Sequence, residues 1–249
     1  MKLFRCSSLS KLMGDAQSIA QEFRTEEIES LIKKRKRSDD ENQVIESLKV
    51  KSLSDGAKSE IRTQAKEDLF TFRAFQGNQY TRKGNMLEDM AIEMSGKMRF
   101  RKYQKHVGRV QNDLITGECD ILDLNNKLII DTKCCWDIGT HPFFQDEAEE
   151  KAKKAGYDWQ MQGYMWLYDC EQAYIDFWLF PCPVELTNDW DDRDQLIDLV
   201  ERIDIRERLT TVVYQRDESM IQKIKDKIPH AQEYYKQCYE QRSKARIQD

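Results

Sequence analysis

The feature that most constrains this chain is the stretch from Gly117 to Lys133, in which two apolar-rich segments flank a pair of asparagines. Residues 117–124 and 127–134 are predicted to form two strands joined across Asn125-Asn126. Asn tolerates the left-handed backbone that a tight hairpin turn requires. In a hairpin folded about this pair, the numbers of opposing residues sum to 251. The register holds if the connecting loop has an even number of residues.

Alternation of side chains across the two strands then sorts the hairpin into two faces. One face is predicted to carry three opposing pairs, which are Asp120 with Asp131, Glu118 with Lys133, and Leu122 with Ile129. The other face is predicted to be core and carries Cys119, Ile121, Ile130 and Thr132. The hairpin therefore gathers its acidic residues and one lysine on the same side.

Two opposed carboxylates, with Cβ atoms roughly 5 Å apart, repel each other and weaken a hairpin. A divalent cation between Asp120 and Asp131 would turn this repulsion into a ligand pair. Mg²⁺ prefers oxygen ligands and is often held by one or two carboxylates together with a substrate phosphate. Lys133 lies two residues beyond Asp131 and can hold a water or a phosphate oxygen, so these groups suit hydrolysis of a phosphodiester. The alternative is a solvent-facing polar stripe with a Glu118–Lys133 ion pair.

Composition and the lack of apolar runs favour a soluble, cytoplasmic protein with a sizeable core. The 249 residues are 39% hydrophobic and 34% charged, with a net charge of −5. No signal peptide and no run of eighteen apolar residues is found, so no membrane segment is expected. The negative charge argues against a protein that coats nucleic acid by bulk attraction, although it leaves room for a local basic channel.

The cysteines and the basic stretches further limit the kinds of binding site that this chain can form. The seven cysteines include no Cys-x-x-Cys, and there are three histidines, so reduced thiols are expected in place of a disulfide framework, a zinc site or an iron–sulfur cluster. Two basic stretches are candidate DNA-binding surfaces, namely Lys33-Lys-Arg-Lys-Arg37 and Lys97-Met-Arg-Phe-Arg-Lys-Tyr-Gln-Lys-His106. The second is favoured because it interleaves aromatic residues and leads into the hairpin.

The remaining elements are predicted from periodicity and capping residues. Helices are expected over 1–13 with a serine cap, from about 56 after Ser54, from about 83 to 95 with Glu88 at the edge of its apolar stripe, over 146–168 with a break at Gly156, over 187–210, and over 217–245 with a possible break at Pro229. Strands are expected within 99–116 and over 173–180 and 211–216, while 15–51 form helices or a mobile arm. Gln160 and Tyr164, four residues apart, share one helix face. One α/β domain with helical additions follows.

The order of these motifs resembles the PD-(D/E)XK nuclease superfamily. The motifs are Gly84-x3-Glu88-x2-Ala91, Gly117-x2-Asp120, Asp131-x-Lys133 and Gln160-x3-Tyr164. Within the superfamily the chain is similar to the lambda-exonuclease and RecE-type, or YqaJ-like, phage recombination exonucleases. Trp159-Gln-Met-Gln-Gly-Tyr-Met-Trp166 resembles the glutamine-bearing helix of lambda exonuclease, and 212–218 resembles its late strand and turn. The second acidic position departs from that enzyme, because it is Asp131 where lambda exonuclease has a glutamate.

The resemblance implies a fold and a set of site residues. It implies a central mixed β-sheet flanked by helices, as in restriction endonucleases, with helical additions at both ends. The expected organisation is a single nuclease domain over 1–249, with an N-terminal helical or arm region (1–60), a catalytic core (61–183) and a C-terminal helical extension with one short strand (184–249). Asp120, Asp131, Glu88 and the backbone carbonyl of Thr132 are implied to hold the metal, while Gln160 and Tyr164 brace Lys133 or the water.

The implied activity is Mg²⁺-dependent digestion of linear duplex DNA from the 5′ end, leaving 3′ overhangs, with Mn²⁺ as a substitute. DNA contacts are expected at Ser7, Arg99, Arg101 and Lys102, although the arginine that binds the 5′-phosphate in lambda exonuclease has no clear counterpart. The implied partners are other copies of the chain in a ring and a single-strand annealing protein, in the cytoplasm of a bacterial host if the chain is phage-encoded. Two alternatives remain open, an endonuclease of the same superfamily and a non-catalytic DNA-end-binding protein.

Overall fold

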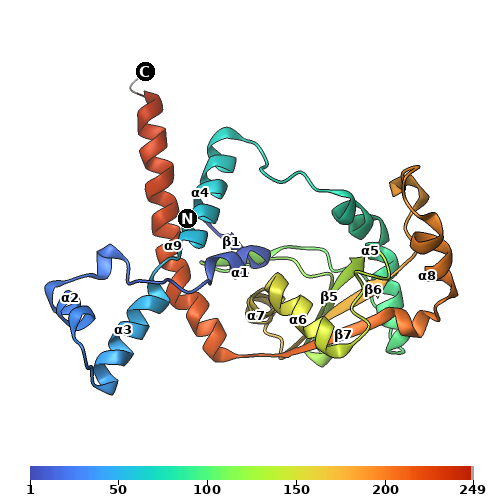
Figure 1. Ribbon diagram of the computed structural model, residues 1–249, viewed down its shortest axis with the longest axis horizontal. Helices are drawn as coiled ribbons and strands as arrows, with labels where there is room; N and C mark the ends of the chain where they lie inside the picture. The colour runs from blue at the N-terminus through green and yellow to red at the C-terminus, as the bar shows by residue number, and fades with distance from the viewer. Residues whose placement is uncertain (248–249) are drawn as a thin grey trace. The chain divides into compact units, whose positions relative to one another are not determined.

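The computed structural model describes residues 1–247, and it divides into two compact units (Figure 1). One unit comprises Met1–Ala74, Gln111–Thr116 and the C-terminal segment that begins at Asp217. The other comprises Phe75–Val110 and Gly117–Arg216, and it contains the hairpin and most of the candidate site residues. The single nuclease domain with divisions after residues 60 and 183 stays a prediction.

A four-stranded mixed sheet forms the centre of the second unit. Its strands are β4 (Ile121–Asp123), β5 (Leu128–Cys135), β6 (Gln172–Leu179) and β7 (Leu209–Gln215), in the order β4-β5-β6-β7. The outer pairs are antiparallel, and β5 pairs with β6 in parallel. A parallel pair needs a crossover connection, which helices α6 (Gln145–Ala155) and α7 (Tyr157–Tyr168) supply between β5 and β6. The α/β class predicted from the sequence is therefore confirmed.

The predicted register of the hairpin is confirmed, although its turn differs in detail. Ile121 pairs with Ile130 and Leu122 with Ile129, so opposing numbers sum to 251. The connection is a short 3₁₀ turn, η3 (Leu124–Asn126). The residue with a left-handed backbone is Lys127 (φ 48°) and not an asparagine. Strand β4 is also shorter than predicted, so Asp120 lies just before it.

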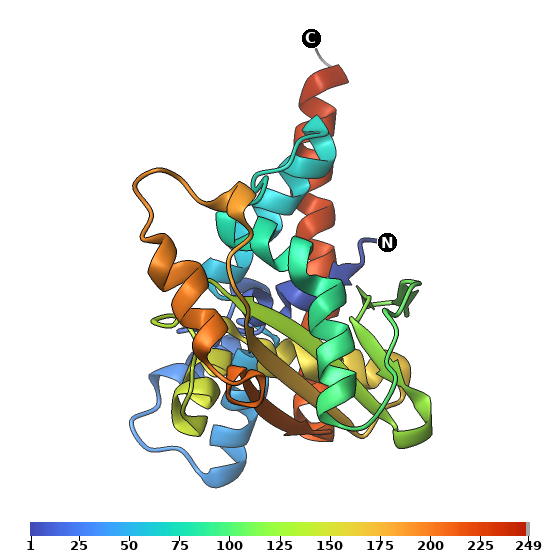
Figure 2. The same ribbon diagram turned by 90° about the vertical axis from the view of Figure 1, so that its right-hand side faces the viewer.

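Helices cover both faces of this sheet. Helix α5 (Gln79–Met98) contacts β5, and its Leu87, Ala91 and Ile92 pack into the clusters that contain Trp178 and Ile130. Helix α6 (Gln145–Ala155) contacts β7, and α7 (Tyr157–Tyr168) contacts β6. Because neighbouring strand residues point to opposite faces, this arrangement buries both sides of β5 (Figure 2).

The start of α5 is fixed by a buried lysine. Asn78 caps the helix by accepting a hydrogen bond from the Thr81 backbone, about one turn before the predicted start. Lys83 is fully buried and donates to the carbonyl oxygens of Trp136 (2.6 Å) and Phe180 (2.7 Å). These carbonyls lie just beyond β5 and β6, so Lys83 ties the helix that carries Glu88 to the ends of two central strands.

The rest of this unit follows the predicted pattern only in part. Gly156, with φ 72°, separates α6 from α7 at the predicted break. The predicted helix over 187–210 is instead a π-helical turn η5 (Asp194–Asp198), a short α8 (Leu199–Arg202) and a 3₁₀ turn η6 (Ile205–Arg208). A further 3₁₀ turn, η4 (Val184–Leu186), precedes them.

The first unit is mainly helical. Its helices are α1 (Leu9–Leu12), α2 (Glu26–Lys33), α3 (Asp39–Lys51), α4 (Asp55–Phe70) and α9 (Glu218–Ile247), with 3₁₀ turns η1 (Cys6–Ser8) and η2 (Gln21–Phe23). Helices α4 and α9 lie side by side in both ribbon views (Figures 1 and 2). A small sheet of order β1-β3-β2 is built from β1 (Phe4–Arg5), β3 (Ile115–Gly117) and β2 (Val110–Gln111).

Several sequence predictions for this unit have clear outcomes. Ser54 caps α4 as predicted, since its hydroxyl accepts a hydrogen bond from the Ala57 backbone. The predicted serine cap near the N-terminus is wrong, because Ser8 makes no side-chain cap to α1. The break at Pro229 is also absent, since Pro229 lies inside a continuous α9. Within residues 1–247, no helix is long and apolar enough to cross a membrane.

Candidate active site

The centre of the candidate site is an ion pair within one strand. Asp131 and Lys133 both belong to β5, two residues apart, and the Lys133 amine contacts the Asp131 carboxylate. The Asp131 side chain is 3% exposed, whereas that of Lys133 is 29% exposed. The Asp131 carboxylate is therefore buried, while the Lys133 amine is partly open to solvent. The prediction that these two residues share one face agrees with the contact.

Asp120 is held beside this pair by the residue between its members. The Asp120 Oδ2 atom accepts a hydrogen bond from the Thr132 backbone N–H at 2.7 Å and another from the Thr132 hydroxyl at 3.0 Å. The carbonyl of Asp120 accepts from the His106 backbone at 2.7 Å. These bonds fix both the side chain and the main chain of Asp120 next to β5. The hairpin thus brings the two predicted acidic residues together.

Burial and neighbouring charges shift the titration of this centre. Burial raises the pKa of Asp131, and Lys133 opposes this shift. The nearby Asp120 and Glu88 carboxylates raise the pKa of Asp131 further. Burial by itself lowers the pKa of Lys133, but the charge of Asp131 outweighs it, so the pKa of Lys133 is raised overall. The lysine is accordingly held in its protonated form.

Glu88 approaches the same centre from α5. Its side chain is 27% exposed and contacts the amine of Lys105, which lies in the irregular segment between α5 and β2. Since Glu88 and Asp120 both act on Asp131, three carboxylates from three separate segments share one electrostatic environment. The part of Glu88 in a metal site stays a prediction.

Helix α7 braces the hairpin on the other side. Gln160 and Tyr164 are both buried, and the Gln160 amide donates to the Tyr164 hydroxyl at 3.2 Å. The Tyr164 hydroxyl donates to the carbonyl of Glu118 at 2.9 Å, and that of Tyr168 donates to the carbonyl of Gly117 at 3.2 Å. Gln160 and Tyr164 therefore lie on one face of α7, as predicted. The Tyr164 hydroxyl joins this pair to the hairpin backbone near Asp120.

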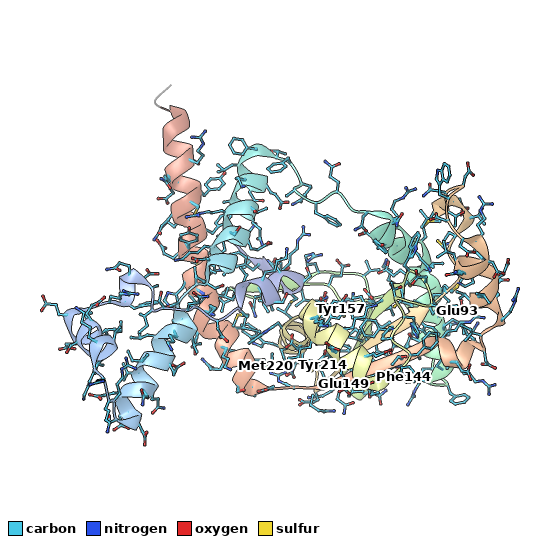
Figure 3. The ribbon with its side chains drawn as sticks, viewed as in Figure 1. Glu93, Phe144, Glu149, Tyr157, Tyr214 and Met220 are labelled. Atoms are coloured by element: carbon cyan, nitrogen blue, oxygen red, sulfur yellow. The ribbon has the colours of Figure 1, made fainter. Side chains whose placement is uncertain are left out.

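Two groups at the site were missed by sequence reasoning. Tyr157, labelled in Figure 3, places its ring 5.3 Å from the Lys133 amine. Its position one helical turn before Gln160 was the available clue. Lys105 was noticed only as part of a basic stretch, and its pairing with Glu88 joins segments that sequence spacing does not relate.

Some predicted contacts are corrected. Glu118 does not face Lys133, because it accepts from the Gly108 backbone at 3.1 Å and pairs with Arg109. Arg99 is not an exposed DNA contact, because its guanidinium forms two 2.7 Å bonds with the fully buried Asp176. A buried carboxylate needs such a partner, so Arg99 serves the fold.

The other proposed DNA contacts are surface residues. Arg101 and Lys102 are exposed in the segment that follows α5. Ser7 is exposed in η1 of the first unit. Their assignment to DNA stays a prediction.

The residues at the centre fit a divalent metal. Among the side chains that the structure describes, no three His, Cys, Asp or Glu residues lie close enough together to hold a metal ion between them. Mg²⁺ does not require three such ligands, since it keeps several waters and is commonly held by one or two carboxylates. Asp120 raises the pKa of Asp131, which shows two acidic groups close enough to repel. A cation of this class held by Asp120 and Asp131 would relieve that repulsion.

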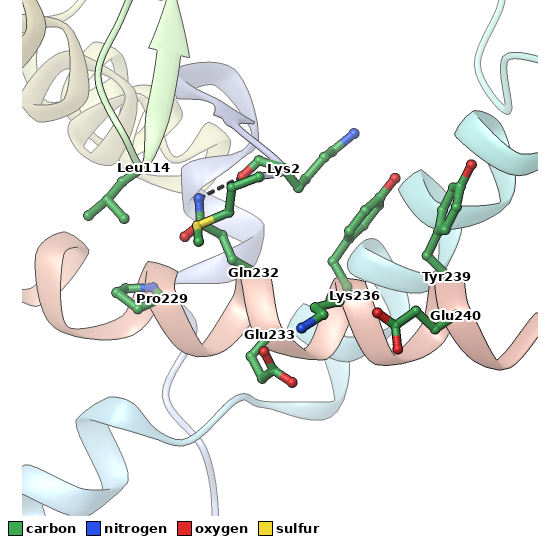
Figure 4. Close-up of a pocket in the computed structure, with 10 residues that line it drawn as sticks. Lys2, Leu114, Pro229, Gln232, Glu233, Lys236, Tyr239 and Glu240 are labelled. Carbon is green, nitrogen blue, oxygen red and sulfur yellow. Dashed lines mark hydrogen bonds between the residues drawn. The ribbon is translucent and has the colours of Figure 1, made fainter.

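The first unit has an apolar pocket of its own. It has a volume of about 580 Å³ and is lined by Lys2, Leu114 and residues of α9. Figure 4 shows Gln232 of α9 donating to the carbonyl of Lys2, a bond of 2.6 Å. None of the predicted catalytic residues lines this pocket.

Comparison with solved structures places the chain among nucleases. A phage-related exonuclease from Haemophilus somnus 129PT is 49% identical, with a TM-score of 0.82 and 96% of each chain covered. An alkaline exonuclease from Laribacter hongkongensis is 15% identical, with a TM-score of 0.56, 80% of this chain and 90% of that chain covered. The same enzyme in complex with dAMP is 16% identical over the same shares, with a TM-score of 0.52. These two more distant structures show a shared fold.

Comparison with family models finds no match, and the search of curated proteins finds none either. The mixed sheet, with an acidic residue and a lysine on its second strand, nevertheless defines a nuclease of the PD-(D/E)XK class. At 49% identity over 96% of its length, the chain belongs to the family of phage-related exonucleases of the lambda-exonuclease, YqaJ-like type. The family resemblance drawn from the sequence is confirmed.

Proposed function

We propose that this enzyme is a Mg²⁺-dependent exonuclease that digests the 5′-ended strand of linear duplex DNA and leaves 3′ single-stranded overhangs. The observation that carries the proposal is the convergence of Asp120 on the Asp131–Lys133 ion pair through Thr132. Two carboxylates and a protonated lysine are the groups that metal-assisted phosphodiester hydrolysis requires. Mn²⁺ is expected to substitute, because it also accepts carboxylate and water ligands.

The residues divide the work of the reaction. A bound metal would polarise the scissile phosphate and lower the pKa of a coordinated water. Asp120 and Asp131 would hold that metal, together with Glu88 and the carbonyl of Thr132. Lys133, whose raised pKa keeps it protonated, would stabilise negative charge that develops on the phosphate and orient the attacking water. It is not suited to act as the general base, since a protonated amine has no lone pair to accept a proton.

The remaining residues position these groups. Tyr164 and Tyr168 hold the backbone that precedes Asp120, and Gln160 orients the Tyr164 hydroxyl. Misplacement of a catalytic group by about 1 Å can cost roughly 10²-fold in rate, so such bracing matters for turnover. Gln160 is also buried, one helical turn after Tyr157, whose ring lies against the Lys133 amine, and this supports its role toward Lys133 or the water.

DNA is the substrate that the family relatives support best. The Laribacter hongkongensis exonuclease is described in complex with dAMP, a mononucleotide of DNA. In this chain, Arg101 and Lys102 are exposed in the segment that leads to the hairpin, where they can contact phosphates. Ser7 is proposed to contact the DNA end.

The decisive experiment uses linear duplexes labelled at the 5′ or the 3′ end, incubated with and without Mg²⁺. Early release of the 5′ label as mononucleotide, only with Mg²⁺, would support the proposal. Early release of the 3′ label would overturn the polarity. Covalently closed circular DNA tests the endonuclease alternative, because an enzyme that needs an end leaves it intact.

Variants test the site directly. Asp131→Ala and Lys133→Ala should each abolish Mg²⁺-dependent digestion of linear duplex while circular dichroism shows that the fold is kept. Retained digestion by either purified variant would overturn the assignment. If the unmodified chain binds DNA ends but does not digest the duplex, it is instead a non-catalytic DNA-end-binding protein.

The family also supports two interactions. We propose that copies of the chain assemble into a ring around DNA and that the ring acts with a single-strand annealing protein in recombination. Light scattering of the purified protein tests the first, since a monomer at micromolar concentration would exclude the ring.

A further inference from the structure

Lys105 makes a contact that the proposed mechanism does not use. Its amine meets the carboxylate of Glu88, although the two residues come from different segments. The Lys105 side chain is 47% exposed, so its amine is open to solvent at the edge of the site. An amine at this place occupies the approach to one of the three carboxylates.

The backbone around Lys105 is fixed even though its side chain is exposed. The neighbouring His106 donates its backbone N–H to the carbonyl of Asp120 at 2.7 Å. The backbone of Gly108 donates to Glu118 at 3.1 Å, and the His106 ring meets the edge of Tyr168 with centroids 5.3 Å apart. These contacts hold the backbone of residues 105–108 against the hairpin, so that the exposed side chain of Lys105 is the part that can move.

Several carboxylates act on the amine. Besides its partner Glu88, the Asp89 and Asp120 carboxylates lie close enough to attract it. Without a cation, Glu88 and Asp120 each repel the charged form of Asp131. Lys105 supplies positive charge at the position where a divalent ion would otherwise do so.

We propose that Lys105 competes with the metal for Glu88, so that ion binding releases its amine to contact a phosphate of the DNA. This inference rests on the proposed function of the site. The contacts that residues 105–108 make with the hairpin keep the released amine beside the carboxylates, within reach of a phosphate that the metal also approaches. Metal loading would then create a DNA contact that the metal-free enzyme lacks.

The competition sets the size of the effect. Partly exposed ion pairs of this kind change equilibria by about two- to fivefold. Removal of the Lys105 amine should therefore tighten metal binding by about that factor, since the ion no longer has to displace it. A merely structural amine would have the opposite effect, because its loss would leave Glu88 less well placed.

The first measurement is calorimetric titration of the DNA-free protein with Mg²⁺ and with Mn²⁺. Lys105→Met should bind each ion about two- to fivefold more tightly than the unmodified chain. The matched control is Lys154→Met, because Lys154 forms an exposed pair with Glu150, four residues away on helix α6, and belongs to no candidate site. Lys154→Met should leave metal affinity unchanged.

The second measurement is the kinetics of digestion of linear duplex in saturating Mg²⁺. Lys105→Met should raise KM severalfold with a smaller change in kcat, and the log–log dependence of KM on salt should fall by about one, as expected for one lost phosphate contact. Lys105→Arg keeps the charge and should restore KM. Lys154→Met should leave both constants unchanged.

The outcomes separate the two proposals. If the unmodified chain neither binds the ions nor digests DNA, the proposed function fails. If it does both, but Lys105→Met binds metal no more tightly than Lys154→Met, or leaves KM and its salt dependence unchanged, the role assigned to Lys105 is wrong.

Discussion

Thr132 donates two hydrogen bonds to the same oxygen of Asp120, one from its backbone N–H and one from its hydroxyl. Thr132 lies between Asp131 and Lys133 in β5, so a single strand both supplies two site residues and orients a third. The backbone bond is available to any residue at this position except proline, whereas the hydroxyl bond depends on the side chain. The identity of residue 132 therefore controls the aim of the Asp120 carboxylate.

Thr132→Val is expected to reduce Mg²⁺-dependent activity by about tenfold, because loss of an outer hydrogen bond to a metal ligand typically costs 10- to 100-fold and the backbone bond remains. Thr132→Ser keeps the hydroxyl and should retain most activity. The measurement is kcat on linear duplex, together with metal affinity by calorimetry. Equal activity of the valine and serine variants would show that the hydroxyl does not orient Asp120.

The sequence was sufficient for the hairpin because its constraints are local. Residues on both sides of Asn125-Asn126 alternate, and one register buries Ile121 and Ile130 together. The period-two pattern leaves little freedom once one face is core. The same local logic placed the break at Gly156, whose left-handed backbone ends α6.

The predictions that failed depend on partners far apart in the chain. Arg99 lies 77 residues from Asp176, and nothing near Arg99 in sequence announces a buried carboxylate. Extending the hairpin ladder predicts that Glu118 lies opposite Lys133. Strand β4 begins only at Ile121, however, so the ladder ends before it reaches Glu118. Tertiary contacts of this kind override strand periodicity at element ends.

Arg99→Lys is expected to lower the free energy of unfolding by about 2 kcal/mol, because a single ammonium cannot reproduce the two-bond contact with a buried carboxylate. The salt dependence of DNA binding should not change, since the guanidinium is engaged inside the protein. Urea unfolding and a salt series of DNA binding measure the two effects. Lys102→Met is the control, and it should leave stability unchanged.

Removal of either member of the Asp131–Lys133 pair should abolish activity but affect stability unequally. Lys133→Met leaves a buried carboxylate without its cation and should cost about 3 kcal/mol. Asp131→Asn should cost less, because it removes a group whose charged form is disfavoured by burial, and Lys133 is partly exposed. Urea unfolding of both variants at pH 8 without metal tests the order. A larger loss for Asp131→Asn would show that the pair is held mainly for the sake of the lysine.

His141 predicts a stability change with pH that is separate from catalysis. Its ring is buried against Phe143, with centroids 4.5 Å apart, and burial lowers its pKa to about 4, with the charge of Lys151 adding to the shift. The unfolded chain, with an ordinary histidine pKa of about 6.5, therefore binds more protons between these values. The stabilising contribution is fully present above about pH 6.5 and is lost as the pH falls towards 4, by about 3 kcal/mol in total.

His141→Phe should remove this part of the pH dependence, because it fills the same apolar site without a titrating group. The measurement is the free energy of unfolding from urea titrations between pH 4 and pH 7.5, taken as the difference between variant and unmodified chain at each pH. His106→Gln is the control, since the His106 ring is only half-buried and bonds to the carbonyl of Gly108 at 2.9 Å. It should leave the slope in place. An unchanged slope in His141→Phe would mean that His141 has the same pKa in the folded and the unfolded chain, so that burial does not lower it.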